Sequence, residues 1–246
     1  MITQYHRPLT LDEAIALTAR PDVVIIAGGT SVNADPGRKP VSAVDLQALD
    51  LAGIDTDGES IRIGSTTRLQ DVVDSNLVPE TLRDLARREA PNTIRNAATI
   101  GGTIGAVDPE SELLAGLLAF NATVTIARAG STTEHALDEL LEDPALLNGS
   151  IMTSVSFPSN GIAAADRTGR TPMDRPIVMA AAHRGHGGAV RVAMTGVSTR
   201  PVVVDPEQID ALDPPSDFRG SSGYRKSLAL VLANRVFATV TGGEPT

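Results

Sequence analysis

The chain has 246 residues, a formal net charge of −9, 41% hydrophobic residues and no cysteine. This length allows one large domain or two smaller ones. The acidic balance argues against nucleic-acid binding, which needs a basic face to neutralise phosphates. The absence of cysteine excludes disulfides, thiolate nucleophiles and iron–sulfur clusters held by cysteines of this chain.

The sequence carries no recognisable targeting or membrane segment. Its first residues lack the apolar region of a signal peptide, and no run of 18 apolar residues occurs anywhere. We therefore expect a cytoplasmic protein without a transmembrane segment.

Helices and short strands alternate along the first part of the chain. Thr10 and Glu13 have the spacing of a capping box, which predicts a helix over residues 11–17. The β-branched run 23–27 predicts a strand buried on both faces, and it leads directly into a glycine pair. Further strands are expected at 43–46, 60–65, 122–127 and 151–157, and further helices at 69–73, 79–90 and 112–120.

The composition changes after residue 158. Residues 161–175 are rich in glycine, alanine, arginine, aspartate and threonine, which predicts a linker between a first domain, 1–160, and a second, 176–246. Within the second domain we expect strands at 176–183, 189–196 and 201–204, a short helix at 207–212, and a final helix at 224–238.

Two glycine-rich passages carry the strongest chemical signal. The first is Ala27-Gly28-Gly29-Thr30-Ser31, and the second is Thr99-Ile100-Gly101-Gly102-Thr103. Adjacent glycines let the backbone approach a ligand closely, and exposed N–H groups with flanking hydroxyls form an anion site. Neither passage has the spacing of the dinucleotide fingerprint or of the phosphate loop. Either passage alone is typical of a turn, so the signal lies in the pair.

Other chemistries find little support in the sequence. His183 and His186 flank a glycine-rich turn, but no carboxylate completes a recognisable metal-ligand pattern. No serine lies in a nucleophile elbow. We therefore assign no catalytic residue and no metal site.

An ordered set of motifs between residues 8 and 238 resembles the FAD-binding subunits and domains of molybdenum hydroxylases. A strand leads into the first glycine passage, and residues 94–102 are similar to the family's second passage. Residues 108–113 resemble the segment that follows it, and residues 217–226 resemble the start of the family's C-terminal helix.

The resemblance implies an α+β fold. Its FAD-binding part is of the type shared with vanillyl-alcohol oxidase, in two subdomains at about 1–55 and 56–160, and a small sheet-plus-helix domain follows it. In the family, both glycine passages hold the FAD pyrophosphate. The resemblance therefore implies that FAD is bound non-covalently. The residues that it predicts to contact FAD are Ala27, Gly28, Gly29, Thr30, Ser31, Thr99, Ile100, Gly101, Gly102, Thr103, Glu112 and Met152.

Two of these residues have specific implied roles. Glu112 takes the place of a family aspartate that accepts hydrogen bonds from FAD hydroxyls; its alternative role is to complement the dipole of the helix that it begins. Met152 takes the place of an apolar residue near the flavin ring; its alternative role is that of an ordinary strand residue.

The resemblance also implies a division of labour. A large partner subunit holds the molybdenum cofactor, a small partner carries two [2Fe–2S] clusters, and this chain passes electrons through FAD to an external acceptor. The expected assembly is a dimer of such heterotrimers.

Three departures from the family pattern keep two alternatives open. Thr103 replaces the asparagine that ends the second passage, and the loop 105–108 is short. No basic residue can be aligned beside the flavin ring, because Arg167, Arg170 and Arg175 lie in the expected linker. The first alternative is a stand-alone flavoenzyme acting on a small molecule, and the second is an interaction subunit that has lost its flavin.

Overall fold

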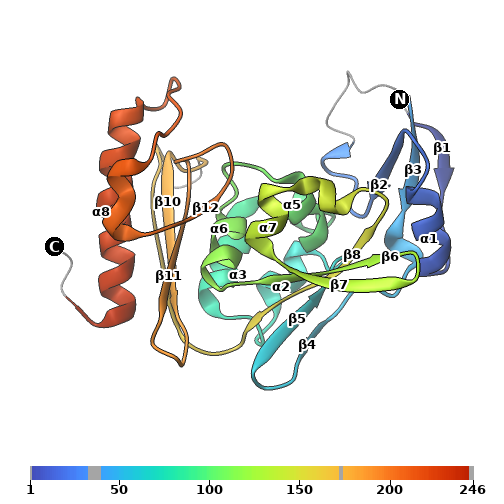
Figure 1. The fold of residues 1–246 in the computed structure, drawn as a ribbon, viewed down its shortest axis with the longest axis horizontal. Helices are drawn as coiled ribbons and strands as arrows, with labels where there is room; N and C mark the ends of the chain where they lie inside the picture. Colours follow the sequence, from blue (N-terminus) through green and yellow to red (C-terminus); the bar gives the residue numbers. More distant parts are fainter. Residues whose placement is uncertain (1, 33–39, 172–173, 244–246) are drawn as a thin grey trace.

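The computed structural model describes residues 2–32, 40–171 and 174–243, which form three β-sheets with helices between and beside them (Figure 1). The expected α+β class is confirmed. Among the described residues, no helix combines the length and the apolar character that crossing a membrane requires.

The first sheet is parallel and contains β1 (Ile2–His6), β3 (Val41–Asp45) and β2 (Val23–Ile26), in that order. Helix α1 (Leu11–Thr18) connects its two edge strands, and the Thr10 hydroxyl caps it by accepting the N–H of Glu13 at 3.3 Å, as predicted. The expectation that the strand at 23–27 is buried on both faces is wrong. These residues form the edge strand β2, and more of the side chains of the central strand β3 are buried.

The second sheet is antiparallel, in the order β4-β5-β8-β6-β7. Its strands are β4 (Ile54–Thr56), β5 (Ser60–Gly64), β8 (Ile151–Pro158), β6 (Thr123–Arg128) and β7 (Ser131–Ala136). The helices packed with it are α2 (Leu69–Asp74), α3 (Glu80–Glu89), α4 (Asn92–Arg95), α5 (Ile100–Ala106), α6 (Glu112–Ala119) and α7 (Leu137–Glu142). Aliphatic side chains from this sheet and these helices form the largest core cluster, as a chain with few aromatic residues requires.

The third sheet is antiparallel, in the order β12-β11-β10-β9, and helix α8 (Ser222–Thr241) covers it at the C-terminal end of the molecule (Figure 1). Its strands are β9 (Ile162–Thr168), β10 (Val178–Arg184), β11 (Val190–Thr195) and β12 (Val202–Val204). Short 3₁₀ helices occur at η2 (Leu46–Ala48), η3 (Pro144–Leu147) and η4 (Pro206–Ala211).

Successive side chains of β10 point to opposite faces of the third sheet and belong to two different core clusters. Met179 and Ala181 belong to the large core cluster with α6, whereas Ala180 and Ala182 belong to the cluster beneath α8. Small alanine side chains on both faces let a helix approach the sheet from each side.

The linker expected at 161–175 is wrong over Ile162–Thr168, which forms β9. This strand pairs with β10 along its whole length, with Thr168 opposite Val178 and Ile162 opposite Arg184. Alanines at 163–165 have low intrinsic strand propensity, so composition suggested a linker, but the neighbouring strand supplies the hydrogen-bond partners.

Candidate cofactor site

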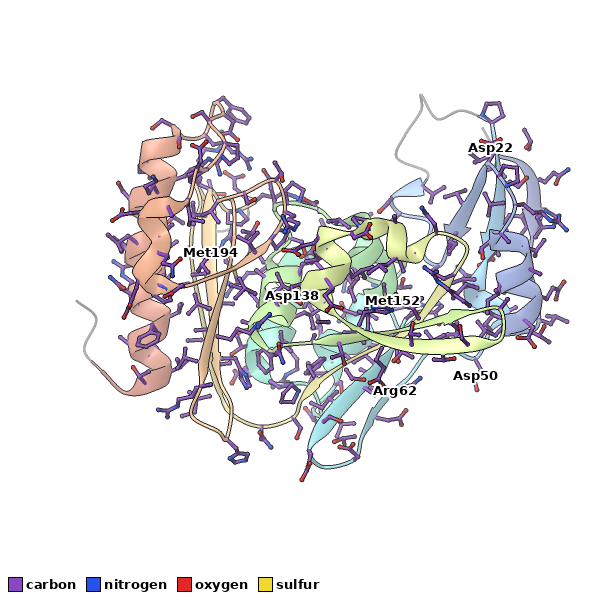
Figure 2. All side chains as sticks on the ribbon, viewed as in Figure 1. Asp22, Asp50, Arg62, Asp138, Met152 and Met194 are labelled. Carbon is purple, nitrogen blue, oxygen red and sulfur yellow. The ribbon has the colours of Figure 1, made fainter. Side chains whose placement is uncertain are left out.

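A cavity of about 1260 Å³ lies between the first sheet and the helices of the second. Strand β2 and both glycine passages line it, together with the segment 147–150 and with Met152 from β8. Figure 2 shows Met152 near the centre of the molecule and Asp22 at the end of the first sheet, and both residues line this cavity. Its volume is ample for a ligand larger than a typical small molecule.

The first glycine passage has the properties of an anion-binding loop. Gly29 has a φ of +71°, a conformation that L-residues rarely adopt. A Cβ on Gly28 would lie 2.0 Å from the carbonyl oxygen of Ala97, so glycine is needed where the first passage packs against the residues just before the second. Among the described residues, the main-chain N–H groups of 28–31 donate to no protein acceptor. These N–H groups are available to a ligand in the cavity.

The second passage is not a loop, because most of it is the first turn of α5. Thr99 caps this helix: its hydroxyl accepts the N–H of Gly102 at 3.1 Å, and its carbonyl accepts the N–H of Thr103 at 2.9 Å. The N–H of Gly101 donates to Ser65 at 2.9 Å, and the N–H of Ile100 donates to Thr67 at 2.9 Å. The expectation that both passages supply N–H donors to the ligand is therefore not supported. The second passage shapes the cavity wall, and the free donors come from the first.

The structure brings ten of the twelve predicted contact residues to the cavity: Ala27, Gly28, Gly29, Thr30, Ser31, Thr99, Gly101, Gly102, Thr103 and Met152. Ile100 is not among the residues that line it, because its side chain is in the large core cluster with 1% of its surface exposed.

Glu112 is the second predicted contact that does not line the cavity. It is 4% exposed, and its carboxylate lies 3.3 Å from Nε of Arg167 and 3.7 Å from Nη1 of Arg88. Burial raises the pKa of the Glu112 carboxyl, and the two guanidinium groups only partly oppose this effect. Its contacts are those of a buried ion pair that joins α6 to α3 and β9.

Five charged residues outside the predicted contact set also line the cavity: Arg20, Asp22, Glu89, Asp108 and Arg175. Nη1 of Arg175 lies 2.5 Å from Oδ2 of Asp108 and 3.8 Å from Oε2 of Glu110. Asp108 opens a segment that the resemblance had singled out, and Arg175 was one of three candidate basic residues. Nothing in the sequence indicated that Glu89 lines the cavity, because it is one charged residue at the end of a helix with many charged residues.

The family model described as the FAD binding domain in molybdopterin dehydrogenase matches residues 1–160. The chain belongs to this family. The predicted family and its cofactor, FAD, are thereby confirmed. This FAD-binding family is one of oxidoreductases, and the match covers the residues that line the cavity up to Met152.

Some relatives of this FAD-binding chain match it along nearly its whole length. The uncharacterized protein YgfM of Escherichia coli (strain K12) is 29% identical, over 97% of this chain and 96% of its own length. The glyceraldehyde dehydrogenase medium chain of Sulfolobus acidocaldarius is 28% identical, over 96% of this chain and 97% of its own.

Solved structures share the fold of this FAD-binding chain. Carbon monoxide dehydrogenase from Hydrogenophaga pseudoflava matches with a TM-score of 0.87 and 23% identity, over 97% of both chains. Quinoline 2-oxidoreductase from Pseudomonas putida 86 matches with a TM-score of 0.83 and 25% identity, over 97% of both chains. The expected architecture, an FAD-binding part followed by a sheet and a helix, is confirmed. The chain thus carries the FAD-binding domain of the molybdopterin dehydrogenase family, in the fold of these solved structures.

Proposed function

We propose that this chain is an electron relay: it takes electrons from [2Fe–2S] clusters of a partner subunit onto FAD and passes them to an external acceptor. The cavity lined by both glycine passages is the observation that carries the proposal. It offers a bound cofactor the N–H groups of 28–31, which donate to no acceptor among the described residues, and the hydroxyl-bearing side chains of Thr30 and Ser31. Such donors stabilise a diphosphate without a formal positive charge.

The composition of the chain supports this division of labour. FAD supplies the redox chemistry when bound, exchanging electrons one or two at a time, while the protein binds and orients it. The chain has no cysteine, so cysteine-ligated iron–sulfur clusters must belong to another subunit. We assign those clusters to a small partner and the molybdenum cofactor to a large one.

Relatives named as parts of larger assemblies support the partner arrangement. They include the medium chain of carbon monoxide dehydrogenase from Hydrogenophaga pseudoflava and subunit alpha of the 6-hydroxypseudooxynicotine dehydrogenase complex from Paenarthrobacter nicotinovorans. We extend the proposal to a dimer of heterotrimers working in the cytoplasm.

The first experiment is an FAD titration of the purified chain, followed by absorbance and flavin fluorescence. The proposal predicts one FAD per chain and a bound-flavin spectrum. A folded chain that binds no FAD at high micromolar concentrations would be the flavin-free interaction subunit instead.

The second experiment separates the relay from a stand-alone flavoenzyme. The chain is co-expressed with candidate large and small partner subunits, and flavin bleaching is followed after addition of the complex's substrate. A relay bleaches only in the complete complex. Bleaching of the isolated chain by a small organic substrate would favour the stand-alone enzyme.

A further inference from the structure

One side chain outside the cavity holds the start of the first glycine passage. Nε2 of Gln47, in η2, donates a hydrogen bond to the carbonyl oxygen of Ala27 at 2.7 Å. Ala27 and Gly28 line the cavity, whereas Gln47 is exposed and does not line it. Among the described residues, no main-chain N–H donates to the Ala27 oxygen. The glycine passage is therefore held at this atom by the Gln47 amide.

The main chain of Gln47 is anchored on a buried carboxylate. Asp45 ends the central strand β3 and is 2% exposed, and its Oδ1 accepts the N–H of Gln47 at 2.9 Å. Its other oxygen, Oδ2, accepts a hydrogen bond from the hydroxyl of Tyr5 and lies 3.9 Å from Nε of Arg7. Because its main chain is fixed in this way, Gln47 loses less conformational freedom when its amide binds Ala27.

The direction of the Ala27 carbonyl determines the direction of the next N–H group. In a trans peptide the C=O and the N–H that follows it point to opposite sides, and no described peptide bond is cis. Since the Ala27 carbonyl is turned toward Gln47, the N–H of Gly28 is turned away from Gln47. That N–H donates to no acceptor among the described residues. The hydrogen bond on the carbonyl also polarises the peptide group, which makes this N–H a stronger donor.

We propose that Gln47 is a positioning residue for the cofactor diphosphate: its amide orients the peptide group between Ala27 and Gly28 so that the Gly28 N–H faces the bound anion. This inference rests on the proposed function. Gln47 acts through the peptide group rather than by contacting FAD. An anion binds more tightly to N–H donors whose directions are fixed beforehand, because the cost of ordering them is not added on binding.

The test compares FAD binding to the wild-type chain and to Gln47→Met, which keeps the length of the side chain but removes its donor. Loss of one neutral hydrogen bond should weaken FAD binding roughly threefold to tenfold in a fluorescence titration. In phosphorus NMR of the FAD-saturated chain, the diphosphate resonances should move from their wild-type positions, while the flavin absorption spectrum stays the same. Urea unfolding of the FAD-free chain should change little, because Gln47 is an exposed residue.

A second variant and a matched control separate hydrogen bonding from other effects. Gln47→Glu has the same shape as the wild type, but at pH 8 its carboxylate can only accept hydrogen bonds and repels the Ala27 carbonyl. It should therefore bind FAD more weakly than Gln47→Met. Gln208→Met is the control, because Gln208 is also an exposed glutamine in a 3₁₀ helix capped by an aspartate, but it does not line the cavity. It should match the wild type in affinity and in phosphorus resonances.

The outcomes are distinguishable. Wild-type affinity and unmoved phosphorus resonances in both Gln47 variants overturn the role of Gln47 and leave the proposed function intact. Weaker binding with a changed flavin spectrum and unmoved phosphorus resonances also overturns this role, because Gln47 would then act on the ring. A folded wild-type chain that binds no FAD overturns both proposals.

Discussion

Gly28 lies where the first glycine passage packs against the residues just before the second, and its substitution tests the shape of the cavity. A methyl group there would lie 2.0 Å from the carbonyl oxygen of Ala97, and main-chain atoms cannot yield as a flexible side chain can. We expect Gly28→Ala to weaken FAD binding at least roughly tenfold, or about 1.4 kcal/mol, in a fluorescence titration. Gly223→Ala is the control, because nothing lies within 4 Å of the added Cβ and the position is on α8. Equal affinity in both variants would show that the contact with Ala97 does not shape the site.

Substitution of Glu112 tests whether this residue forms a structural ion pair or binds FAD, which is the role that the resemblance implied. Its carboxylate pairs with Arg167, whose side chain is 14% exposed, and a glutamine amide carries no charge to balance that guanidinium. We expect Glu112→Gln to lower the free energy of unfolding by about 3 kcal/mol, with FAD affinity changed less than roughly threefold. Urea unfolding followed by circular dichroism measures the first effect, and FAD titration measures the second.

The matched control for Glu112 is Glu142→Gln, which removes one partner of an exposed ion pair. Glu142 is 65% exposed and lies 2.8 Å from Arg200, so its loss should cost about 0–1 kcal/mol. A large loss of FAD affinity in Glu112→Gln with unchanged stability would restore its assignment as a cofactor ligand.

Among the elements, α8 packs on the third sheet through an apolar cluster and also through the buried guanidinium of Arg225. Arg225 is 3% exposed, and it donates to the carbonyls of Ile177 at 2.5 Å and Gly196 at 3.0 Å and to Asp217 at 2.8 Å. Lysine cannot reproduce this planar set of donors. We expect Arg225→Lys to lower the free energy of unfolding by about 2–4 kcal/mol in urea.

The same helix supplies the comparison for Arg225. Arg235 is 58% exposed and lies 3.3 Å from Asp166, so Arg235→Lys should change stability by less than about 1 kcal/mol. Equal effects of the two substitutions would mean that α8 is held by apolar packing rather than by Arg225.

The elements also show what a sequence can predict. Capping and hydrophobic periodicity are local, and the helices beginning at Leu11, Glu80 and Glu112 begin within a residue of their expected positions. Strand β9 was missed because its stability comes from pairing with β10, a contact that no local pattern records. Helix α5 was missed because its first turn is rich in glycine, which normally disfavours helix.

For the candidate site, the resemblance to the family predicted which passages lie at the cavity. It did not predict which of their side chains and N–H groups face the cavity. Ten predicted residues line the cavity, yet Ile100 and Glu112 do not. Whether an N–H such as that of Gly101 is free depends on whether Ser65 lies beside it, which only the tertiary structure shows. Arg175 is distant in sequence from both glycine passages, yet it lines the cavity beside Asp108.

At the scale of the whole molecule, one core spans the FAD-binding part and the third sheet. Met179, Ala181 and Ala193 belong to the same buried cluster as the helices of the second sheet. Because the third sheet completes this cluster, we expect both parts to unfold in one cooperative transition, with FAD released in the same step.

Substitution of Ala181 tests this shared core. Ala181 is 2% exposed on the face toward α6, and Ala181→Leu overfills the contact at a cost of about 1–3 kcal/mol. We expect the midpoints for helix loss and for flavin release to fall together, by roughly 5 °C, in a heated sample followed by circular dichroism and flavin fluorescence. Ala211→Leu, at an exposed position in η4, should leave both midpoints unchanged. Flavin release that stays at the wild-type temperature while part of the helix signal is lost earlier would mean that the third sheet unfolds independently of the cofactor site.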